Sequence, residues 1–450
     1  MKVKHRSSSL RLHVRADSVA VMSHAGASLV QGTSDAVGLT AGLARALGSL
    51  RRRDAGHDPG CVIRDLAVSI ADGGRTVSAI EALRGQSELF GGVASDATAW
   101  RVLDRLTPEL CQSALAELAK ARARVWAHPR VELPRLLVID GDATLVNAHS
   151  DKEGAAGNYK HGFGFHPIVW SLDATREPLA VMLRPGNAGA NRAADLIGSL
   201  ELALEQLPDR AFDIERHHVV VRLDSAGASH AVVEDLFERG LGFVIGFDLT
   251  DTVWDAIEAV GPRSWKPAVD QDGVERDYAH VAELDVDMSG WGEGLRLVAR
   301  REIAHAGAQL RMVDAGGWRH QVILTNLADD DIAFIAAVYQ GRGRAEQVID
   351  ELKQTGLGHL PSARYETNEA WVLTSLIAAT LVRWAQLLTL DGRWQKVRIA
   401  TLRNELLHTG ARIVRHARKT TLVLNQAWAA TGALIRAFAR LRQLPAAQPM

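Results

Sequence analysis

The sequence predicts an α/β fold in which a β-sheet core is interrupted by a β-rich insertion and flanked by helical regions at both ends. Apolar residues recur at helical spacing in the first part of the chain, and from Arg135 they form strand-length runs that alternate with helical patterns. A tryptophan-rich stretch of short alternating runs then breaks this progression. The expected divisions are residues 1–130 (helical), 131–249 (first part of the core), 250–327 (insertion), 328–390 (second part of the core) and 391–450 (helical and basic).

The composition is that of a globular protein. The chain has 450 residues, of which 47% are hydrophobic, enough for two to four domains. The formal net charge is −1, so the overall charge gives no support for nucleic-acid binding, for which the distribution of charge matters more. The two cysteines, Cys61 and Cys111, are far apart, which argues against a structural zinc site and a secreted disulfide scaffold. We expect two buried, reduced thiols in a cytosolic protein.

Three short helices are predicted in the N-terminal region, over residues 61–70, 76–83 and 95–106. Asp72-Gly73-Gly74 ends the first, and Ser95 is the expected N-cap of the third. The tight turns are compatible with a helix-turn-helix in which Arg101 and Arg105 face a DNA groove. An ordinary helical bundle with solvated arginines fits the same pattern equally well.

The core begins with three extended runs, followed by helix, strand, helix and strand. This is the order of an RNase H-like sheet. The strands are expected over residues 135–146, 162–173, 177–187, 217–224 and 241–249, and the helices over residues 191–207 and 229–239.

The insertion is expected to contain hairpin strands over residues 295–304, 308–317 and 320–327. It also holds four of the eleven tryptophans, Trp254, Trp265, Trp291 and Trp318. After it, one helix is predicted from near Asp331 to about Gln354. The apolar segment 370–390 contains too many polar residues for a convincing membrane span and is expected to be a buried core helix. The chain ends in a basic stretch, residues 412–442, whose cations have no acidic partner in that segment.

Three carboxylates occupy costly positions in this scheme. Asp140 and Asp142 interrupt an apolar strand and share one face of it with Thr144. Asp224 ends the fourth strand, which neighbours the first in an RNase H-like sheet, so Asp142 and Asp224 are expected to be adjacent. Hard oxygen ligands of this kind suit magnesium in phosphodiester chemistry. Taken singly, each aspartate is also explained as a turn residue at a strand end.

The predicted helix after the insertion carries Tyr339, Arg342, Glu346 and Lys353 near one stripe. On its own this spacing is common on solvent-exposed helices with ion pairs. It gains weight because it follows two strand aspartates in the chain.

At these residues the chain resembles the DDE transposases of bacterial insertion sequences. Tyr339, Arg342, Glu346 and Lys353 match the Y-(2)-R-(3)-E-(6)-K motif of that group without a gap. Other segments resemble in particular the insertion-sequence family numbered thirteen-eighty. They are HDPG at His57, SDATAWRVLDR from Ser95, DATLVNAHSDKEGAAGNYKHGFGFHP from Asp142, LRPGNAGAN from Leu183 and RLDSAG from Arg222.

The resemblance implies an RNase H-like catalytic core with two Mg²⁺ ions, for which Mn²⁺ can substitute. Asp142, followed two places on by Thr144, would be the first catalytic and metal-binding carboxylate, with Asp140 as second choice. Asp224 and Glu346 would complete the set. Tyr339, Arg342 and Lys353 would hold DNA phosphates, and one tryptophan of the insertion would stack on a flipped base.

The implied activity is cleavage at the ends of an insertion sequence and joining of the 3′-OH ends to target DNA. The partners would be double-stranded DNA, as terminal inverted repeats and as target, and a second copy of the chain in a homodimer. The N-terminal helices and the basic C-terminal region would recognise the repeats. The basic N-terminus lacks a signal-peptide segment, so we expect a cytoplasmic, nucleoid-associated protein without a membrane partner. An RNase H-like nuclease without strand transfer and an inactive transposase-derived repressor are the alternatives.

Overall fold

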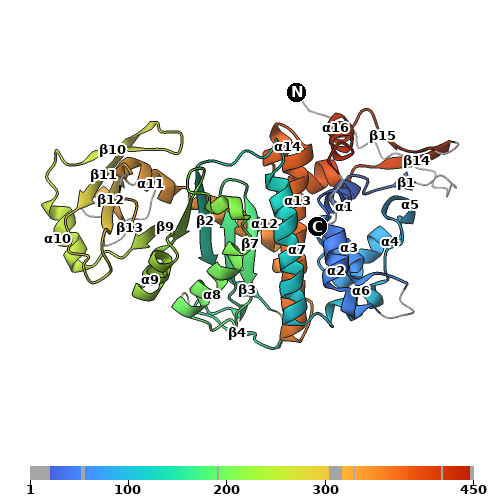
Figure 1. Cartoon of the computed structure of the whole chain (residues 1–450), viewed down its shortest axis with the longest axis horizontal. Helices are drawn as coiled ribbons and strands as arrows, with labels where there is room; N and C mark the ends of the chain where they lie inside the picture. Colours follow the sequence, from blue (N-terminus) through green and yellow to red (C-terminus); the bar gives the residue numbers. More distant parts are fainter. Residues whose placement is uncertain are drawn as a thin grey trace, which may run out of the picture.

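The computed structural model describes residues 21–51, 56–148, 151–189, 192–303, 317–328, 330–416 and 419–445. A large sheet occupies one half of the elongated molecule and helices occupy the other (Figure 1). Two long helices, α7 (Pro108–Trp126) and α13 (Tyr365–Thr389), stand between the halves. The first and last described segments of the chain lie together at the helical end.

The centre of the sheet has the strand order that the sequence predicts. Within the nine-stranded sheet, the order β7-β6-β2-β8-β9 places the first core strand beside the fourth. The pairs β2–β8 and β8–β9 are parallel, while β6 and β7 run antiparallel. The core strands are β2 (Leu136–Ala143), β6 (Ile168–Leu172), β7 (Glu177–Met182), β8 (His218–Leu223) and β9 (Gly242–Phe247).

The insertion extends this sheet instead of forming a separate β-unit. Its strand β13 (Trp318–Thr325) pairs antiparallel with β9, and β12 (Arg296–Ile303), β11 (Glu275–Leu284) and β10 (Lys266–Val269) follow outward. The strands predicted over residues 295–304 and 320–327 correspond to β12 and β13. Residues 308–316 of the predicted middle strand lie outside the described residues. A helix that the pattern did not predict, α10 (Asp251–Ala259), precedes the strands.

Helices cover both faces of the sheet. On one face, α8 (Ala193–Leu204) and α9 (His230–Glu238) share the main hydrophobic core with Val221 and Ile245. On the other face, α11 (Ile332–Gln340) packs its Ile335 and Tyr339 against Val220 and Val244. The alternation of side chains along buried strands produces these two layers.

Helix α13 is the buried core helix that the sequence predicts. It is long and apolar enough to cross a membrane, but 94% of its most apolar window is buried within the protein. The carboxylate of Glu177 accepts hydrogen bonds from Arg122, Trp126 and Trp384, at 2.9, 3.0 and 2.7 Å, and so joins β7 to α7 and α13. All three donors are buried, so this group satisfies the polar atoms of the helix pair.

The N-terminal region is helical, as expected. Helix α3 (Pro59–Ala71) is buried along nearly its whole length and is the centre of this region. The predicted second helix is a short irregular turn ending in α4 (Glu81–Arg84), and the third, α6 (Asp96–Leu103), stops before Leu106. Ser95 caps α6 by accepting a hydrogen bond from the Thr98 amide. The other helices are α1 (Ala27–Ala36), α2 (Leu39–Ala46) and α5 (Ser87–Phe90).

The C-terminal region differs from the helical prediction because it contains a β-hairpin, β14 (Ala411–His416) and β15 (Lys419–Leu424). A short strand, β1 (Val21–Met22), pairs with β14. Within the basic stretch 412–442, two cations have acidic partners outside the stretch: Arg415 pairs with Glu88 at 3.7 Å and Arg440 with Asp391 at 2.6 Å. Arg418 lies outside the described residues. The remaining elements are α12 (Gly343–Leu352), α14 (Arg393–Lys396), α15 (Ile399–Leu402), α16 (Thr431–Leu441), β3 (Val146–Asn147), β4 (Ala156–Gly157) and β5 (Phe163–Phe165).

Candidate active site

Asp142 and Asp224 meet where the parallel strands β2 and β8 end. Asp142 is the penultimate residue of β2, and Asp224 directly follows β8. The guanidinium of Arg342 spans them, with its Nη2 at 3.1 Å from Asp142 and 3.5 Å from Asp224. The expected adjacency of the two aspartates is therefore present. We call Asp142, Asp224, Glu346 and Arg342 the acid site.

Glu346 joins this group from the first turn of α12, where the helix dipole favours an anion. Burial raises the pKa of Asp142, and the negative charges of Asp224 and Glu346 raise it further, while Arg342 opposes them. The same carboxylates outweigh the effect of burial on Arg342 and raise the pKa of its guanidinium. These carboxylates are thus close enough to repel one another, and one arginine compensates them.

The predicted single helix from Asp331 to Gln354 is wrong in one respect, because a turn at Gly341–Arg342 divides it into α11 and α12. A Cβ atom on Gly341 would lie 2.4 Å from an Arg222 nitrogen and 2.9 Å from an Arg344 nitrogen. A larger residue here would force these two guanidinium groups to shift, and both are held in ion pairs with Asp140 and Asp173. The turn places Arg342 between Tyr339 on α11 and Glu346 on α12.

Asp140 has a different environment from Asp142, although both belong to β2. It is only 2% exposed, and Arg222 on β8 donates to its two oxygens at 2.5 and 2.8 Å. Arg222 also lies 3.5 Å from Asp173, which pairs with Arg344 of α12. Burial raises the pKa of Asp140 to about 6, against the opposing effect of Arg222. We call Asp140, Arg222, Asp173 and Arg344 the inner ion-pair layer.

Tyr339 is 6% exposed and packs over Gly246 of β9. A Cβ on Gly246 would lie 2.4 Å from the Tyr339 hydroxyl and 2.7 Å from the Ser225 amide nitrogen, next to Asp224. Gly246 therefore lets the tyrosine approach the segment that carries Asp224. Sequence reasoning missed this glycine, although an isolated glycine inside a strand pattern signals a close approach. Gly141 is similar, since its Cβ would lie 2.6 Å from the Trp170 ring.

Lys353 lies at the C-terminal end of α12 and is partly buried. Burial lowers its pKa, Lys160 lowers it further, and Asp142 acts in the opposite direction, so Lys353 lies near both. Lys160 comes from a turn that Asn158 holds, with the Asn158 side-chain oxygen accepting from the amides of Lys160 and Gly162 at 3.0 Å each. Lys160 is a second residue that sequence reasoning missed, although it lies within the family-like segment from Asp142.

The structure does not bring Arg101 and Arg105 to the acid site. Both are exposed in the N-terminal helical region. Arg101 donates to the Ala97 carbonyl and the Thr98 hydroxyl within α6. Arg105 lies beyond the end of α6 and donates to the Leu50 carbonyl at 3.3 Å.

The four tryptophans of the insertion have intramolecular aromatic or cationic neighbours. Arg301 lies between Trp265 and Trp318, at 4.0 and 4.6 Å from their ring centroids. Trp291 stacks on His230 at 3.9 Å, and Trp254 meets His320 edge-on at 5.0 Å. Trp254, Trp265 and Trp291 belong to the core opposite the face on which Tyr339 packs. Base stacking by one of them stays a prediction.

The donor set of the acid site fits hard divalent cations. Its three acidic residues offer only carboxylate oxygens, the ligands that Mg²⁺ prefers. In this structure the positive charge between two of them is the Arg342 guanidinium, which shows that a cation is favoured there. Asp142, Asp224 and Glu346 are therefore the residues that would hold metal ions.

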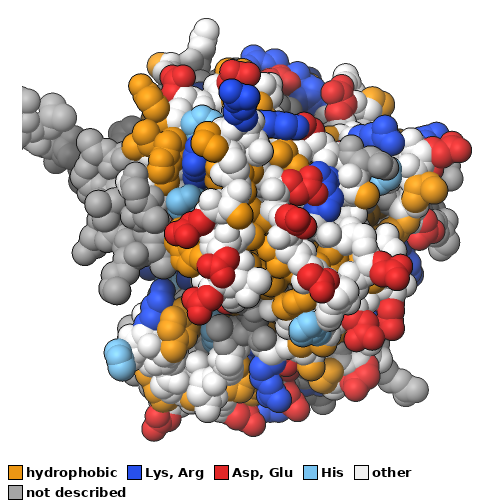
Figure 2. Space-filling view, turned by 90° about the vertical axis from the view of Figure 1, so that its left-hand side faces the viewer, with side chains coloured by type: hydrophobic (Ala, Val, Ile, Leu, Met, Phe, Trp, Pro, Cys, Tyr) orange, Lys and Arg blue, Asp and Glu red, His pale blue; other side chains and the backbone are white. Residues whose placement is uncertain are grey.

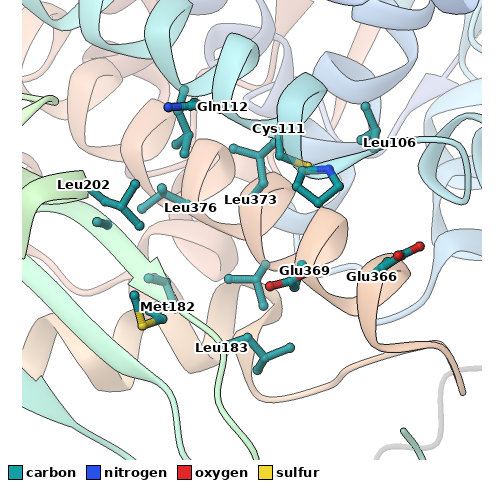
Figure 3. Close-up of a pocket in the computed structure, with 15 residues that line it drawn as sticks. Leu106, Cys111, Gln112, Met182, Leu183, Leu202, Glu366, Glu369, Leu373 and Leu376 are labelled. Carbon is teal, nitrogen blue, oxygen red and sulfur yellow. The ribbon is translucent and has the colours of Figure 1, made fainter. Parts of the chain in front are cut away.

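An apolar cavity lies away from the acid site. It has a volume of about 370 Å³ between α7, α13 and the β7–α8 side of the sheet (Figure 3). Cys111, Met182, Leu373 and Glu369 are among its lining residues, and no acid-site residue is. Burial raises the pKa of Cys111 to about 12, so the thiol is protonated at neutral pH and is a weak nucleophile.

Figure 2 shows the insertion end of the molecule. Acidic side chains are spread over its middle and lower parts, with hydrophobic side chains between them and basic ones mainly near the upper edge. The described side chains on this face therefore form no continuous basic surface of the kind that follows a DNA backbone.

Comparison with known proteins identifies the family of the chain. The family described as "Transposase DDE domain group 1" matches residues 4–446. A solved piggyBac transposase in a synaptic complex with hairpin DNA is similar at a TM-score of 0.44 and 10% identity, covering 85% of this chain and 79% of that chain. No curated protein matches. Because the family match spans nearly the whole chain, the protein belongs to the group 1 DDE transposase family.

Proposed function

We propose that the protein is the transposase of an insertion sequence and that Asp142, Asp224 and Glu346 are its catalytic carboxylates. It would bind the terminal inverted repeats of its element, cleave phosphodiester bonds at the ends, and join the 3′-OH ends to target DNA. One observation carries this proposal: residues far apart in the chain converge at the ends of β2 and β8, where Arg342 bridges Asp142 and Asp224. Segment similarities make the insertion-sequence family numbered thirteen-eighty the proposed branch.

Each group at the acid site has a definable task. Metal ions bound by the three carboxylates would activate water and neutralise charge on the attacking and leaving oxygens. Tyr339 packs beside the Asp224 segment and would hold that carboxylate in place. The inner ion-pair layer fixes α12 against the sheet, since Arg344 of α12 pairs with Asp173 beside the Asp140–Arg222 pair. Rigid support of this kind keeps reacting groups in position.

Tyr339, Arg342 and Lys353 stay the proposed contacts to the phosphates of the DNA ends, and Lys160 is added to them. The Nε of Arg342 is buried and has no hydrogen-bond partner among the described residues, so the guanidinium has a donor to spare. On DNA binding, Arg342 would exchange its carboxylate partners for phosphate oxygens, which guanidinium groups bind with two parallel hydrogen bonds. Lys353, which lies near Asp142, and Lys160, which lies near Lys353, would add positive charge along the DNA strand.

The partners are double-stranded DNA and a second copy of the chain, since two ends must be held together for joining. Arg101 on α6 and Arg105 in the turn after it, both exposed, are proposed contacts to the repeat. The hairpin β14–β15 carries further exposed cations, among them Arg412 and Lys419. Phosphate contacts by these groups make affinity for DNA fall steeply with salt concentration. The proposed location is the bacterial cytoplasm, at the nucleoid.

The test uses the purified full chain, Mg²⁺ and a labelled duplex that contains one terminal repeat and its flank. Wild-type protein should nick the duplex at the repeat boundary and, with added target plasmid, give joined products. Asp224→Asn should give neither, whereas Asp235→Asn, the same change on α9, should retain both. Cleavage without joining would instead identify a nuclease, and specific binding without cleavage would identify a transposase-derived repressor.

A further inference from the structure

Three side chains outside the acid site form a second cluster of potential metal ligands. His24 precedes α1, Asp72 caps the C-terminus of α3, and His408 precedes β14. One potential ligand atom from each lies within 4.8 Å of the other two, and within the described residues no other group of three has been found to do so. We call these residues the His-Asp-His cluster.

The two imidazoles converge on one carboxylate. His24 Nδ1 contacts Asp72 Oδ2, and His408 Nε2 lies 3.3 Å from Asp72 Oδ1. The rings have centroids 4.7 Å apart and are tilted at 56°. The Asp72 side chain is 6% exposed, whereas the His24 and His408 side chains are 26% and 35% exposed, so the cluster has an open side.

One oxygen of the buried Asp72 carboxylate lacks a hydrogen bond within the described structure. Asp72 Oδ1 has no hydrogen-bond partner within the described structure, since His408 Nε2 donates to the Asp72 carbonyl at 2.8 Å instead. Asp72 Oδ1 has lost its hydration and keeps only the 3.3 Å contact with His408 Nε2, and buried oxygens without a hydrogen bond are rare in folded proteins. A cation between the imidazoles and the carboxylate would satisfy it.

We propose that His24, Asp72 and His408 bind a divalent transition-metal ion of the Zn²⁺ class, with solvent completing the coordination on the open side. Two imidazole nitrogens and one carboxylate oxygen suit Zn²⁺ and Co²⁺, whereas Mg²⁺ prefers oxygen ligands alone. The site is thus chemically distinct from the acid site, and it does not depend on the proposed function.

Binding must displace protons, because an imidazole nitrogen that faces the carboxylate carries a proton when it donates to it. Each such nitrogen releases that proton and gives its lone pair to the metal, so affinity rises with pH. Arg403 faces the cluster, acts on both Asp72 and His408, and donates to the Ile70 and Ala71 carbonyls, while Arg75 lies near Arg403. The positive charge of Arg403 opposes a divalent ion, so the affinity should be below that of a zinc finger.

The bound ion would fasten the two ends of the chain to each other. Asp72 and His408 are 336 residues apart in sequence. Next to the cluster, Ala25 and Gly26 donate to the carbonyls of Thr409 and Leu407, at 3.0 Å each, where β1 meets β14. Metal binding would therefore anchor the basic hairpin β14–β15 to α3.

The experiment titrates the tag-free, metal-depleted full chain with Co²⁺ and Zn²⁺. We expect a single high-affinity ion per chain, visible Co²⁺ absorption bands of a site with nitrogen ligands, proton release, and a higher unfolding temperature with Zn²⁺. His24→Gln and His408→Gln should each weaken Co²⁺ binding by at least about 100-fold. His416→Gln, an exposed histidine on β14, and Asp142→Asn should leave it unchanged.

Absence of saturable Co²⁺ binding by the wild type would overturn the proposal whatever the variants do. Unchanged binding in folded His24→Gln and His408→Gln proteins would also overturn it, as would loss of the Co²⁺ bands in Asp142→Asn, which would place the ion at the acid site. Failure of the DNA-cleavage assay has no bearing on these results.

Discussion

Two aspartates on one strand, Asp140 and Asp142, lie two residues apart and face the same side of the sheet, yet their surroundings are opposite in kind. Asp140 is buried, and its two oxygens accept hydrogen bonds from one arginine of the neighbouring strand. Asp142 lies at the strand end, its side chain is 19% exposed, and it shares Arg342 with Asp224 at longer distances. The inner ion-pair layer is a completed contact, whereas the acid site has more negative charge than its single arginine can neutralise.

Under the proposed function, this difference makes the outer carboxylates the ones that would take a ligand. A buried pair with good geometry loses several kcal/mol when one partner is removed, so the protein cannot release Asp140 for chemistry. Carboxylates at an exposed strand end keep their affinity for cations and can exchange partners. Substitutions in the two layers test this contrast, and the largest effect is expected at the acid site.

Removing a carboxylate from the acid site should abolish cleavage and leave the fold intact. Glu346→Gln should lower the cleavage rate by at least about 10⁴-fold, as removal of one member of a catalytic unit does. Asp350→Asn, one turn further along α12 and exposed, is the matched control and should remain active. Single-turnover cleavage of the repeat duplex and circular dichroism measure the two properties. Equal loss in both variants would mean that α12 acts through its fold alone.

Arg222→Met should destabilise the protein by about 3–5 kcal/mol, because it leaves Asp140 buried without its partner. Urea unfolding at pH 8 measures the change. Arg239 forms a partly exposed ion pair with Asp235 at the C-terminal end of α9. Arg239→Met should therefore lower the free energy of unfolding by less than about 1 kcal/mol. A loss below 1 kcal/mol for Arg222→Met would remove the distinction between the two layers.

The same variant carries a pH signature. The pKa of Asp140 is already raised to about 6 by burial, and Arg222 holds it below the value it would otherwise reach. Without Arg222 the folded-state pKa rises further, so the variant loses stability as pH rises above 6 while the wild type has levelled off. The difference in free energy of unfolding between the wild type and Arg222→Met should therefore become smaller when pH falls from 8 to 6. A constant difference over this range would contradict the pairing of Arg222 with an ionised Asp140.

Gly246→Ala should cost about 1–3 kcal/mol of stability, typical of overpacking, because the new methyl group meets the Tyr339 hydroxyl and the Ser225 amide. It should also slow cleavage, since the Asp224 segment shifts. The control is Gly343→Ala, because a Cβ there meets open space. Gly273→Ala is unsuitable, since its positive φ would strain an alanine. Retained cleavage despite measurable destabilisation would separate Tyr339 packing from catalysis.

The smallest expected effect is that of Arg342→Gln on DNA affinity. The affinity should fall about tenfold or less, because one phosphate contact is lost. The slope of log affinity against log salt should become shallower by about 0.9 for that contact. Fluorescence anisotropy at several salt concentrations gives the slope, with Arg319→Gln as a control on β13. An unchanged slope would mean that Arg342 binds only the carboxylates.

The centre of the fold was predictable because its signals are local. Apolar runs, turn residues and strand order predicted the five core strands, and two aspartates at the ends of adjacent strands predicted a shared site. The different roles of Asp140 and Asp142 were not predictable in this way. They depend on Arg222, whose pairing with Asp140 follows from the register of two strands that lie 82 residues apart.

The remaining differences also have long-range causes. The sequence pattern predicted strands in the insertion. It could not predict that they continue the core sheet, because this depends on the pairing of β13 with β9. The break between α11 and α12 arises where Arg222 and Arg344 crowd Gly341, which lies within a helical pattern. The β14–β15 hairpin was not predicted, because the basic segment was expected to be helical. Its Thr420, Thr421 and Val423 are β-branched residues, which favour strands.

The most direct test of the acid-site assignment is the rate of Mg²⁺-dependent cleavage of the repeat duplex by Asp142→Asn, in protein whose unfolding temperature matches the wild type. The account predicts a folded protein that binds the repeat and does not cut it. Cleavage at the wild-type rate would contradict the account and return the role of first carboxylate to Asp140.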